Sequence, residues 1–322
     1  MRVLNLCFSD NAGAAYTLSH ALNKLGHTSI NLRAQNNYIN YPTIASVSNY
    51  SREDCARLAE KSDTVVFHSA IMPFIQGLGL DMSILDTKKK VVYFHGSELR
   101  AGAPMLLKQA DEYLGNYQTL VSTPDLLEYV EHGTWMPCIR SFNELTQQFG
   151  KSKTDTEALK EYGVPFTKTL LGHSPTNPQV KGTQIFQKAI TRLLDVYPNA
   201  EYVSITNQAW DSCIRTMSSL DLFFDQALLG SYGLAAVEAS IFKIPVFCYI
   251  SEKTASAMEE LSGCENPFIQ WKDEDELIER IYYLCEHPEE KVKFGSSAYR
   301  YCQLVHDEKP GAERFIKAVS EK

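Results

Sequence analysis

The stretch Asp225-Gln-Ala-Leu-Leu-Gly-Ser-Tyr-Gly-Leu-Ala-Ala-Val-Glu-Ala-Ser-Ile-Phe-Lys-Ile-Pro-Val246 decides the fold class of this chain. It predicts the end of a strand, a turn that contains glycine, a helix, and a second strand after the proline. Such a succession is typical of a parallel sheet. Gly230 and Gly233 lie in the turn, where backbone amides at a helix N-terminus favour an anionic group such as a diphosphate. Glu238, about one and a half turns into the helix, is placed to accept hydrogen bonds from sugar hydroxyls.

The same alternation of short apolar runs and longer amphipathic stretches continues through the chain in both directions. It predicts strands at 3–8, 29–33, 64–68, 91–95 and 119–122, and again at 168–172, 202–205, 221–224, 246–250 and 267–270. The expected helices are 14–25, 124–130, 182–194, 210–217, 233–242, 255–261, 275–286, 289–306 and 312–319. The pattern therefore predicts an α/β protein built on parallel sheets.

The length of 322 residues fits two domains of about equal size. The polar stretch 140–162 lacks any β-branched apolar run and is expected to bridge them, so we predict domains at 1–150 and 151–305. The last residues, 306–322, are expected to form a helix that packs back on the first domain. Two Rossmann-like domains would face each other across a cleft, with ligands at the carboxyl ends of the strands.

Composition excludes several classes of protein. With 44% hydrophobic and 22% charged residues, the chain is neither disordered, collagen-like nor a coiled coil. A net charge of −8 gives no general attraction to nucleic acid or to an anionic membrane surface. The eight cysteines show no metal-binding spacing, and no apolar run approaches the roughly 18 residues of a membrane span. We therefore expect a cytoplasmic protein without an integral membrane segment.

Two other loops carry residues that suit an anionic ligand. In Leu171-Gly-His-Ser-Pro-Thr-Asn-Pro-Gln-Val-Lys-Gly-Thr183, Lys181 precedes a helix and could neutralise a phosphate. The loop Ser9-Asp-Asn-Ala-Gly-Ala-Ala15 after the first strand brings small residues to another helix N-terminus. No G-x-G-x-x-G follows a strand, and there is no P-loop, so nicotinamide and P-loop chemistry have no support. The acids 273–275 are explained by helix capping rather than by a metal.

At these residues the chain resembles the retaining glycosyltransferases of the two-Rossmann-domain (GT-B) type, especially family 4. Lys181-Gly182 is similar to the Lys-Gly pair at the start of the first helix of their second domain. Gly233 to Ala239 and Ile244-Pro-Val resemble their Gly-x-x-x-x-Glu-Ala and Gly-x-Pro-Val passages. In the first domain, the loop with Gly13 and the run Phe94-His95-Gly96-Ser97 look like the family's counterparts.

The resemblance implies a hexosyl- or pentosyltransferase that moves a sugar from a UDP- or GDP-type donor to an acceptor hydroxyl, with retention. It implies no cofactor and no metal. The acceptor, a glycan or another hydroxyl-bearing molecule, would bind to 1–150 and the donor to 151–305. The implied catalytic residues are His95, which would contact the donor sugar, Lys181 and Glu238; the donor-binding residues are Gly13, His173, Gly230, Ser231, Tyr232 and Gly233; the acceptor-side residues are Asn11, His68 and Arg100.

The chain departs from the family pattern at three points. Gly230 stands where members usually carry the first of two glutamates, and His173 stands where they carry an arginine, with a longer loop before Lys181. The first domain also shows no large basic patch for a membrane. A sugar-nucleotide epimerase of the same fold and a non-catalytic nucleotide-sugar or glycan-binding protein therefore stay open. A glycosyltransferase that acts on a modified nucleic-acid base is a further alternative, which the acidic balance disfavours.

Several of these residues also have a purely structural interpretation. A histidine at a strand end can be a buried residue with protein partners, which applies to His68, His95 and His173. Gly13 and Gly233 can serve only to shape turns.

Overall fold

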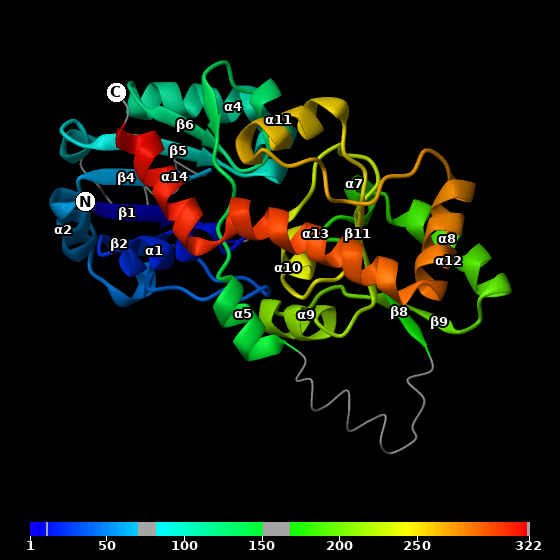
Figure 1. The fold of residues 1–322 in the computed structure, drawn as a ribbon. Coiled ribbons are helices and arrows are strands. Elements are labelled where there is room, and N and C mark those ends of the chain that lie inside the picture. Colours follow the sequence, from blue (N-terminus) through cyan, green and yellow to red (C-terminus); the bar gives the residue numbers. More distant parts are fainter. Residues whose placement is uncertain (11, 70–81, 151–167, 321–322) are drawn as a thin grey trace. The chain divides into compact units, whose positions relative to one another are not determined.

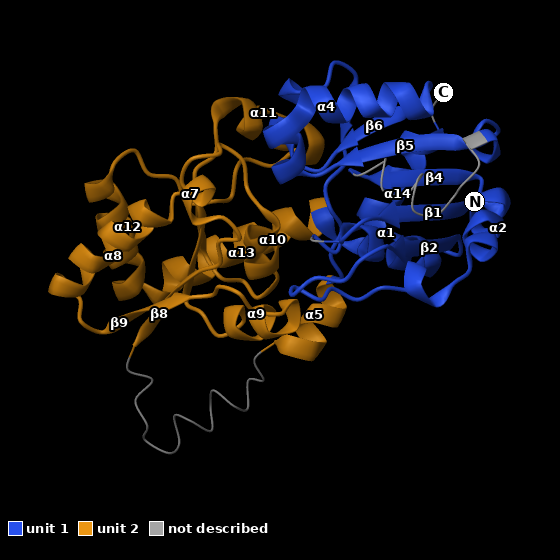
Figure 2. Ribbon diagram, turned by 180° about the vertical axis from the view of Figure 1, so that it is seen from behind, with its two compact units in different colours: residues 1–141, 306–322 blue, residues 142–305 orange. Residues whose placement is uncertain are grey.

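The computed structural model describes residues 1–10, 12–69, 82–150 and 168–320, coloured along the chain in Figure 1. The chain divides into two compact units, Met1–Ser141 with His306–Lys322 and Phe142–Val305 (Figure 2). The first unit thus ends at Ser141, whereas the predicted boundary stood at 150. The described part of the expected bridge at 140–162 contains helix α5 (Phe142–Phe149). Its remainder, 151–162, lies outside the described residues.

The first unit is built on a seven-stranded sheet in the order β3-β2-β1-β4-β5-β6-β7, with every neighbouring pair parallel. Its strands are β1 (Arg2–Cys7), β2 (Thr28–Arg33), β3 (Ala45–Ser46), β4 (Thr64–His68), β5 (Lys89–Phe94), β6 (Gln118–Val121) and β7 (Gly133–Trp135). The five predicted strands of this half are present. The two additional strands, β3 and β7, are two and three residues long, too short for a pattern of alternation to appear in the sequence.

Helices α1 (Ala14–Lys24), α2 (Arg52–Lys61), α4 (Gly96–Leu114) and α14 (Glu308–Ser320) belong to the same unit. The sequence did not indicate α2, which is mostly charged and begins with a capping box between Ser51 and Asp54. It did not indicate α4 either, because Gly102 has non-helical backbone angles and Pro104 follows inside the helix. The predicted helix 124–130 was wrong in type, since Pro124–Glu128 forms a 3₁₀ helix.

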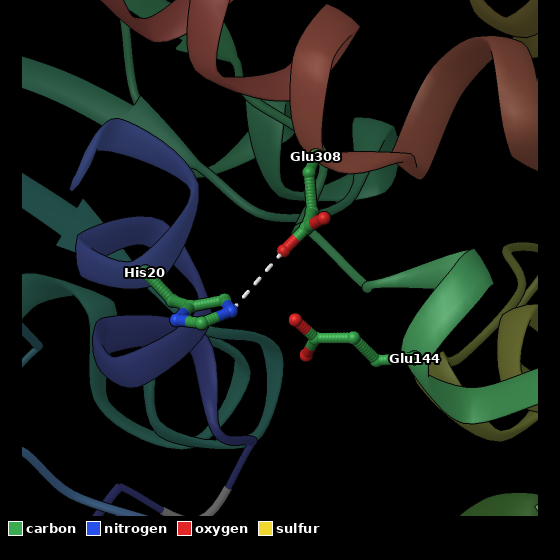
Figure 3. A group of neighbouring side chains, drawn as sticks. All are labelled: His20, Glu144 and Glu308. Carbon is green, nitrogen blue, oxygen red and sulfur yellow. Dashed lines mark ion pairs between the residues drawn. The ribbon is translucent and has the colours of Figure 1, made fainter. Parts of the chain in front are cut away.

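Helix α14 returns the end of the chain to the first unit, where it packs against α1. One carboxylate oxygen of Glu308 forms an ion pair with the ammonium group of Lys24 at 2.7 Å. Its other oxygen lies 3.6 Å from Nε2 of His20 (Figure 3). At the opposite end of α14, Gln118 donates to the carbonyl of Ala318. These contacts fix the terminal helix on this unit at both of its ends.

The second unit holds a four-stranded parallel sheet in the order β11-β10-β8-β9. Its strands are β8 (Thr169–His173), β9 (Ala200–Ser204), β10 (Leu222–Gln226) and β11 (Val246–Cys248). The surrounding helices are α5, α7 (Pro178–Lys181), α8 (Thr183–Val196), α9 (Trp210–Met217), α10 (Leu234–Ile241), α11 (Glu252–Ser262), α12 (Glu274–Glu286) and α13 (Pro288–His306). The core contains β8, β10, β11, α8 and α12, with Phe186, Phe224 and Phe247 in mutual ring contact.

The predicted strand 267–270 was wrong in extent, because only Ile269 forms a bridge, to Phe247. Pro267 has no backbone N–H to donate to a longer ladder. The α/β class with two Rossmann-like parallel sheets is otherwise confirmed. Every helix among the described residues is too short or too polar to cross a bilayer. The eight cysteines are free thiols.

We predict that His306 makes the stability of the chain fall in acid. The ring is buried, Nδ1–H donates to the carbonyl of Cys138 at 2.7 Å, and burial lowers the pKa to about 3, with Arg314 and Arg140 acting in the same direction. Between pH 6.5 and 3 the unfolded chain therefore binds a proton at His306 that the folded chain does not. Because of this group, the free energy of unfolding falls by up to about 1.4 kcal/mol for each unit by which the pH is lowered in that range.

Urea unfolding at several pH values between 7 and 4.5 measures this slope. His306→Gln is expected to reduce it relative to the wild type, whatever its effect on stability at pH 7. The exposed His132 supplies the matched control, and His132→Gln should leave the slope almost unchanged. Equal slopes for the wild type and His306→Gln would contradict the prediction.

Candidate functional site

A buried carboxylate, Asp225, lies at the carboxyl end of β10 and joins three segments of the second unit. Its Oδ1 accepts from Nζ of Lys181 at 2.9 Å, and its Oδ2 accepts from the backbone N–H of Gly233 at 2.6 Å. The Cys248 thiol donates to Oδ2 at 3.6 Å. Burial and the Asp225 charge raise the pKa of Cys248 well above its usual value, so this thiol stays protonated. A buried charge needs such partners, and Asp225 is only 2% exposed.

Asp225 was not among the predicted site residues, although its contacts hold Lys181 and Gly233 together. The signal was a carboxylate directly after the apolar run Leu222-Phe-Phe224 within the same strand. Its partner Lys181 lies 44 residues upstream, which no spacing rule covers.

Lys181 is held at the end of α7, where the chain turns sharply into α8. Gly182 takes a left-handed conformation with φ 71° between the two helices. The carbonyl of Lys181 accepts from the N–H of Ala227 at 3.0 Å, which ties this turn to the end of β10. Its side chain is 15% exposed. An ammonium group has three N–H donors, and Asp225 is the acceptor found for it among the described residues, so Lys181 can also bind an anion.

Gly233 is the N-cap of α10, and it is needed for space rather than for an unusual backbone angle. Its φ is −98°, which any residue can adopt. A Cβ atom here would lie 2.6 Å from Nζ of Lys181 and 3.1 Å from Oδ1 of Asp225. The glycine therefore allows the ion pair to form directly against the N-terminus of α10. The backbone N–H of Gly233 already donates to Asp225 and is not available to a ligand. An anionic ligand at this site would therefore bind to the ammonium group of Lys181.

The loop between β10 and α10 is organised by the buried amide of Gln226. Its Oε1 accepts from the N–H groups of Leu228 and Leu229, and its Nε2 donates to the carbonyls of Tyr249 and Ser231. These bonds satisfy the backbone of a tight loop, which would otherwise lose its polar partners on burial.

Three predicted donor-binding residues lie in this loop, and each has different surroundings in the structure. Gly230 has φ 68°, and its carbonyl accepts from the N–H of Ser251 at 2.9 Å. The hydroxyl of Ser231 is enclosed and has no partner among the described residues. The Tyr232 side chain is buried, and its hydroxyl lies 3.1 Å from that of Tyr301. Tyr232 thus supports the core, which argues against the predicted ligand contact through its side chain.

Glu238 is 4% exposed on α10 and already has a protein partner. The indole Nε1–H of Trp210, at the start of α9, donates to its Oε1 at 2.9 Å. A buried carboxylate among apolar neighbours needs such a partner, and no sequence pattern indicated that Trp210 supplies it. Trp210 orients the carboxylate within a largely apolar setting.

His173 does not have the arrangement of a ligand-binding residue. The ring is fully buried; Nδ1–H donates to the carbonyl of Phe224 at 2.7 Å, and Nε2 accepts from the hydroxyl of Thr183 at 2.8 Å. Burial lowers its pKa, which keeps the ring neutral. Both ring nitrogens are thus used inside the protein, where the ring links β8, β10 and α8, and the predicted donor contact has no support in this geometry.

In the first unit, the glycine loop before α1 is also filled by its own side chains. Asp10 accepts from the N–H groups of Ala15 at 3.2 Å and Tyr16 at 2.9 Å, so its carboxylate takes the amides expected to face an anion. Gly13 has φ 62°, and a Cβ there would lie 2.5 Å from the ring of Tyr41. The backbone angle and the Tyr41 ring therefore explain why glycine stands at position 13, and its predicted ligand role stays a prediction. Asn11 lies outside the described residues.

The other first-unit residues predicted for a site lie near the carboxyl ends of β4 and β5. His68 and His95 are in direct contact, with Nδ1 of His68 3.1 Å from Nε2 of His95. Arg100, in the first turns of α4, forms an ion pair with Asp125 at 2.6 Å, and its guanidinium covers Gly96. The structure thus brings the two histidines together, while the Arg100 charge is already balanced by Asp125.

Comparisons with known proteins identify the architecture. Neither a protein-family model nor a curated protein sequence matches the chain. Among solved structures, Anabaena HepE in complex with UDP and glucose is similar over 100% of both chains, with a TM-score of 0.68 and 14% identity. A glycosyltransferase from Rickettsia africae covers 99% of this chain and 98% of its own, with a TM-score of 0.62 and 12% identity. Sucrose-phosphate synthase from Thermosynechococcus elongatus covers 98% of each chain, with a TM-score of 0.61 and 12% identity. At these identities the likeness establishes the fold, and the chain has the predicted GT-B architecture.

We predict that Gly233→Ala breaks the ion pair while the unit still folds. The new methyl group is compatible with the backbone, but it displaces Nζ of Lys181 from Asp225 and leaves a buried carboxylate poorly paired. The free energy of unfolding, measured in urea, is expected to fall by about 1–3 kcal/mol.

A double-mutant cycle checks the cause of that loss. In a Lys181→Ala background the methyl group has no ammonium to displace, so Gly233→Ala should cost clearly less there. An equal cost in both backgrounds would show that the methyl group acts elsewhere.

We further predict that the backbone at Gly230 resists any side chain. A residue with Cβ at φ 68° costs about 1–2 kcal/mol, and here Cβ would also lie 3.1 Å from Cβ of Ser251. Gly263→Ala is the matched control, because Gly263 has φ 69° and open space around it. Urea unfolding should show a larger loss for Gly230→Ala than for Gly263→Ala, and the reverse order would refute the packing argument.

Proposed function

We propose that this chain is a glycosyltransferase that moves a hexosyl or pentosyl group from a nucleotide-diphosphate sugar to an acceptor hydroxyl. The observation that carries this proposal is the partly exposed Lys181, fixed by Asp225 against the N-terminus of α10 at the carboxyl end of the sheet. Parallel sheets of this type bind ligands at that end. HepE, which shares the architecture, was solved with UDP-glucose, and this supports UDP before GDP as the nucleotide of the donor.

In this proposal the second unit binds the donor. Lys181 neutralises charge on the diphosphate, and Asp225 keeps the ammonium in place before the ligand arrives. The enclosed hydroxyl of Ser231 is a further donor for a phosphate or sugar oxygen. Glu238 accepts hydrogen bonds from donor hydroxyls, and the indole of Trp210 sets its orientation.

The reaction we propose retains the configuration of the sugar and uses neither a protein nucleophile nor a metal. The bond between the anomeric carbon and the diphosphate oxygen breaks, and its electron pair leaves with the diphosphate. The acceptor oxygen forms the new bond on the same face, and its proton passes to the departing phosphate oxygen. Lys181 stabilises the charge that develops on that leaving group.

The first unit is proposed to bind the acceptor, with His68 and Arg100 at the carboxyl side of its sheet, while His95 is proposed to contact the donor sugar. We also propose that the enzyme works in the cytoplasm, because eight free cysteines fit a reducing compartment.

A ligand panel tests the proposal directly. Thermal unfolding is measured with UDP, GDP, ADP and UDP-glucose, because a ligand at about 100 times its Kd adds about 2.7 kcal/mol to the unfolding free energy. UDP and UDP-glucose are expected to give the largest shifts. The absence of a shift with every nucleotide would overturn the proposal.

Product analysis then separates transfer from the other reactions of this architecture. Incubation of UDP-glucose with a panel of hydroxyl acceptors, with and without EDTA, should give a glycoside of retained configuration in both cases. Epimerised UDP-sugar without acceptor would identify an epimerase, and tight binding without any turnover would identify a binding protein.

We predict that Lys181→Met weakens UDP binding by at least tenfold, because it removes the cation that faces the diphosphate. The matched control is Lys188→Met on the adjacent helix α8, where the ammonium pairs with Glu274 and is 71% exposed. Calorimetric titration with UDP should give a Kd for Lys188→Met close to that of the wild type. Equal affinities of Lys181→Met and the wild type for UDP would show that Lys181 does not bind the diphosphate.

A further inference from the structure

A chain of hydrogen bonds in the first unit begins at Asn5, a fully buried polar residue in the middle of the apolar strand β1. Its Nδ2 donates to Oγ of Ser19 at 2.9 Å and to Oγ of Ser29 at 3.1 Å. Its Oδ1 faces Nε2 of His68 at 3.1 Å. The amide thus contacts α1, β2 and β4 from one position.

The two serines fix the orientation of this amide. Ser29 Oγ donates its single hydroxyl proton to Ser19 Oγ at 3.2 Å. Having no second proton, Ser29 Oγ can only accept from Asn5, so the NH₂ group must face the serines. The carbonyl oxygen of Asn5 must therefore face His68.

This orientation sets the tautomer of His68. A carbonyl oxygen accepts only, so Nε2 of His68 carries the proton. The ring is buried, and burial, followed by the neighbouring His95, holds its pKa well below 6.5. At neutral pH the ring is therefore uncharged, and Nδ1 is left as a lone pair.

The lone pair in turn sets the tautomer of His95. Nδ1 of His68 lies 3.1 Å from Nε2 of His95, so that Nε2 must carry a proton. Burial lowers the pKa of His95 to about 4, which leaves its Nδ1 as an unprotonated acceptor at neutral pH. That Nδ1 is enclosed and has no partner among the described residues.

The surroundings hold this ring in one orientation. It stacks on His68 with an interplanar angle of 18° and lies 4.6 Å from the ring of Tyr93. The backbone N–H of His95 donates to Oγ of Ser69 at 3.1 Å. If none of the residues outside the described ranges donates to it, such a fixed, enclosed acceptor costs about 1–3 kcal/mol, and a bound hydroxyl would recover that energy.

We propose that Asn5 and His68 are positioning residues that lock His95 in its Nε2–H tautomer, so that Nδ1 accepts a hydrogen bond from a ligand hydroxyl. The lock itself follows from the protein contacts alone. The identification of the hydroxyl as one of a sugar substrate rests on the proposed function.

Nuclear magnetic resonance of protein labelled with ¹⁵N-histidine reads the tautomers directly. Long-range ¹H–¹⁵N spectra at pH 7 should show His68 and His95 each as a single neutral species with a protonated Nε2. The exposed His132 serves as an internal reference for a ring that is free to exchange. A protonated Nδ1 on His95, or an average of both tautomers, would overturn the proposal.

Two substitutions of one residue provide the matched test. His68→Gln keeps a donor for Asn5 and an acceptor for His95, so the Nε2–H tautomer of His95 should persist. His68→Leu removes both groups, so His95 should show both tautomers. Circular dichroism and thermal unfolding confirm that each variant is folded. If the two variants give the same His95 spectrum, His68 does not set the tautomer.

Addition of UDP-glucose completes the experiment. The Nδ1 resonance of His95 is expected to shift as it accepts the hydroxyl, while Nε2 stays protonated. Calorimetric binding without any change at His95 would refute the ligand contact. A lack of UDP-glucose binding would count against the proposed function, whereas the spectra without ligand would still decide the tautomer lock.

Discussion

The second unit depends on one buried charge, the carboxylate of Asp225. It connects the end of β10, the turn before α8 and the first amide of α10 through contacts of 2.9 and 2.6 Å. Without it, Lys181 would have no anion among the described residues to hold it in a site that is mostly enclosed. A charge pair of this kind gives little net stability, because both groups lose water, yet removing either partner is costly. Its value lies in geometry, since it places an ammonium group at a fixed point.

Both units have a buried carboxylate at the N-terminus of a helix, but its consequences differ between them. In each unit, a carboxylate at or just after the end of a strand accepts from backbone N–H groups at the start of the next helix: Asp10 before α1 and Asp225 before α10. Burial raises the pKa of Asp10, while its backbone hydrogen bonds lower it. Asp225 differs because a lysine with further N–H donors lies against it. The helix terminus alone therefore does not make an anion site in either unit, and the cation makes the second one suitable.

Much of the architecture could be predicted from the sequence because parallel strands are short apolar runs whose pattern is local. The passage from β10 to β11 shows this, since turn, helix and strand follow one another within 22 residues. The position of Lys181 before a helix was equally local. The partners of these residues were not, because Asp225, Trp210 and Thr183 are brought to Lys181, Glu238 and His173 by the sheet order rather than by spacing.

The histidines illustrate the same limit in finer detail. His68, His95 and His173 all stand near strand ends, and for each of them the sequence leaves a purely structural role open. In the structure His173 uses both ring nitrogens within the protein, whereas His95 has one enclosed nitrogen to which no described residue donates. The difference comes from Thr183 beside one ring and from the Asn5 and His68 chain beside the other. Such side-chain networks depend on which strands are neighbours, so they become visible only with the fold.

The glycine at position 230 is explained by its backbone rather than by a lost side chain. With φ 68° and Ser251 packed against it, the loop has a shape that favours glycine, and Gln226 secures that shape from the opposite side. A glutamate at this point would require a different loop, because Cβ alone would strain it. In the proposed function, recognition of a sugar by this unit would then depend on other groups near the carboxyl end of β10. The Ser231 hydroxyl and the Glu238 carboxylate are the groups proposed for this role, which would make specificity depend on the loop and on α10 together.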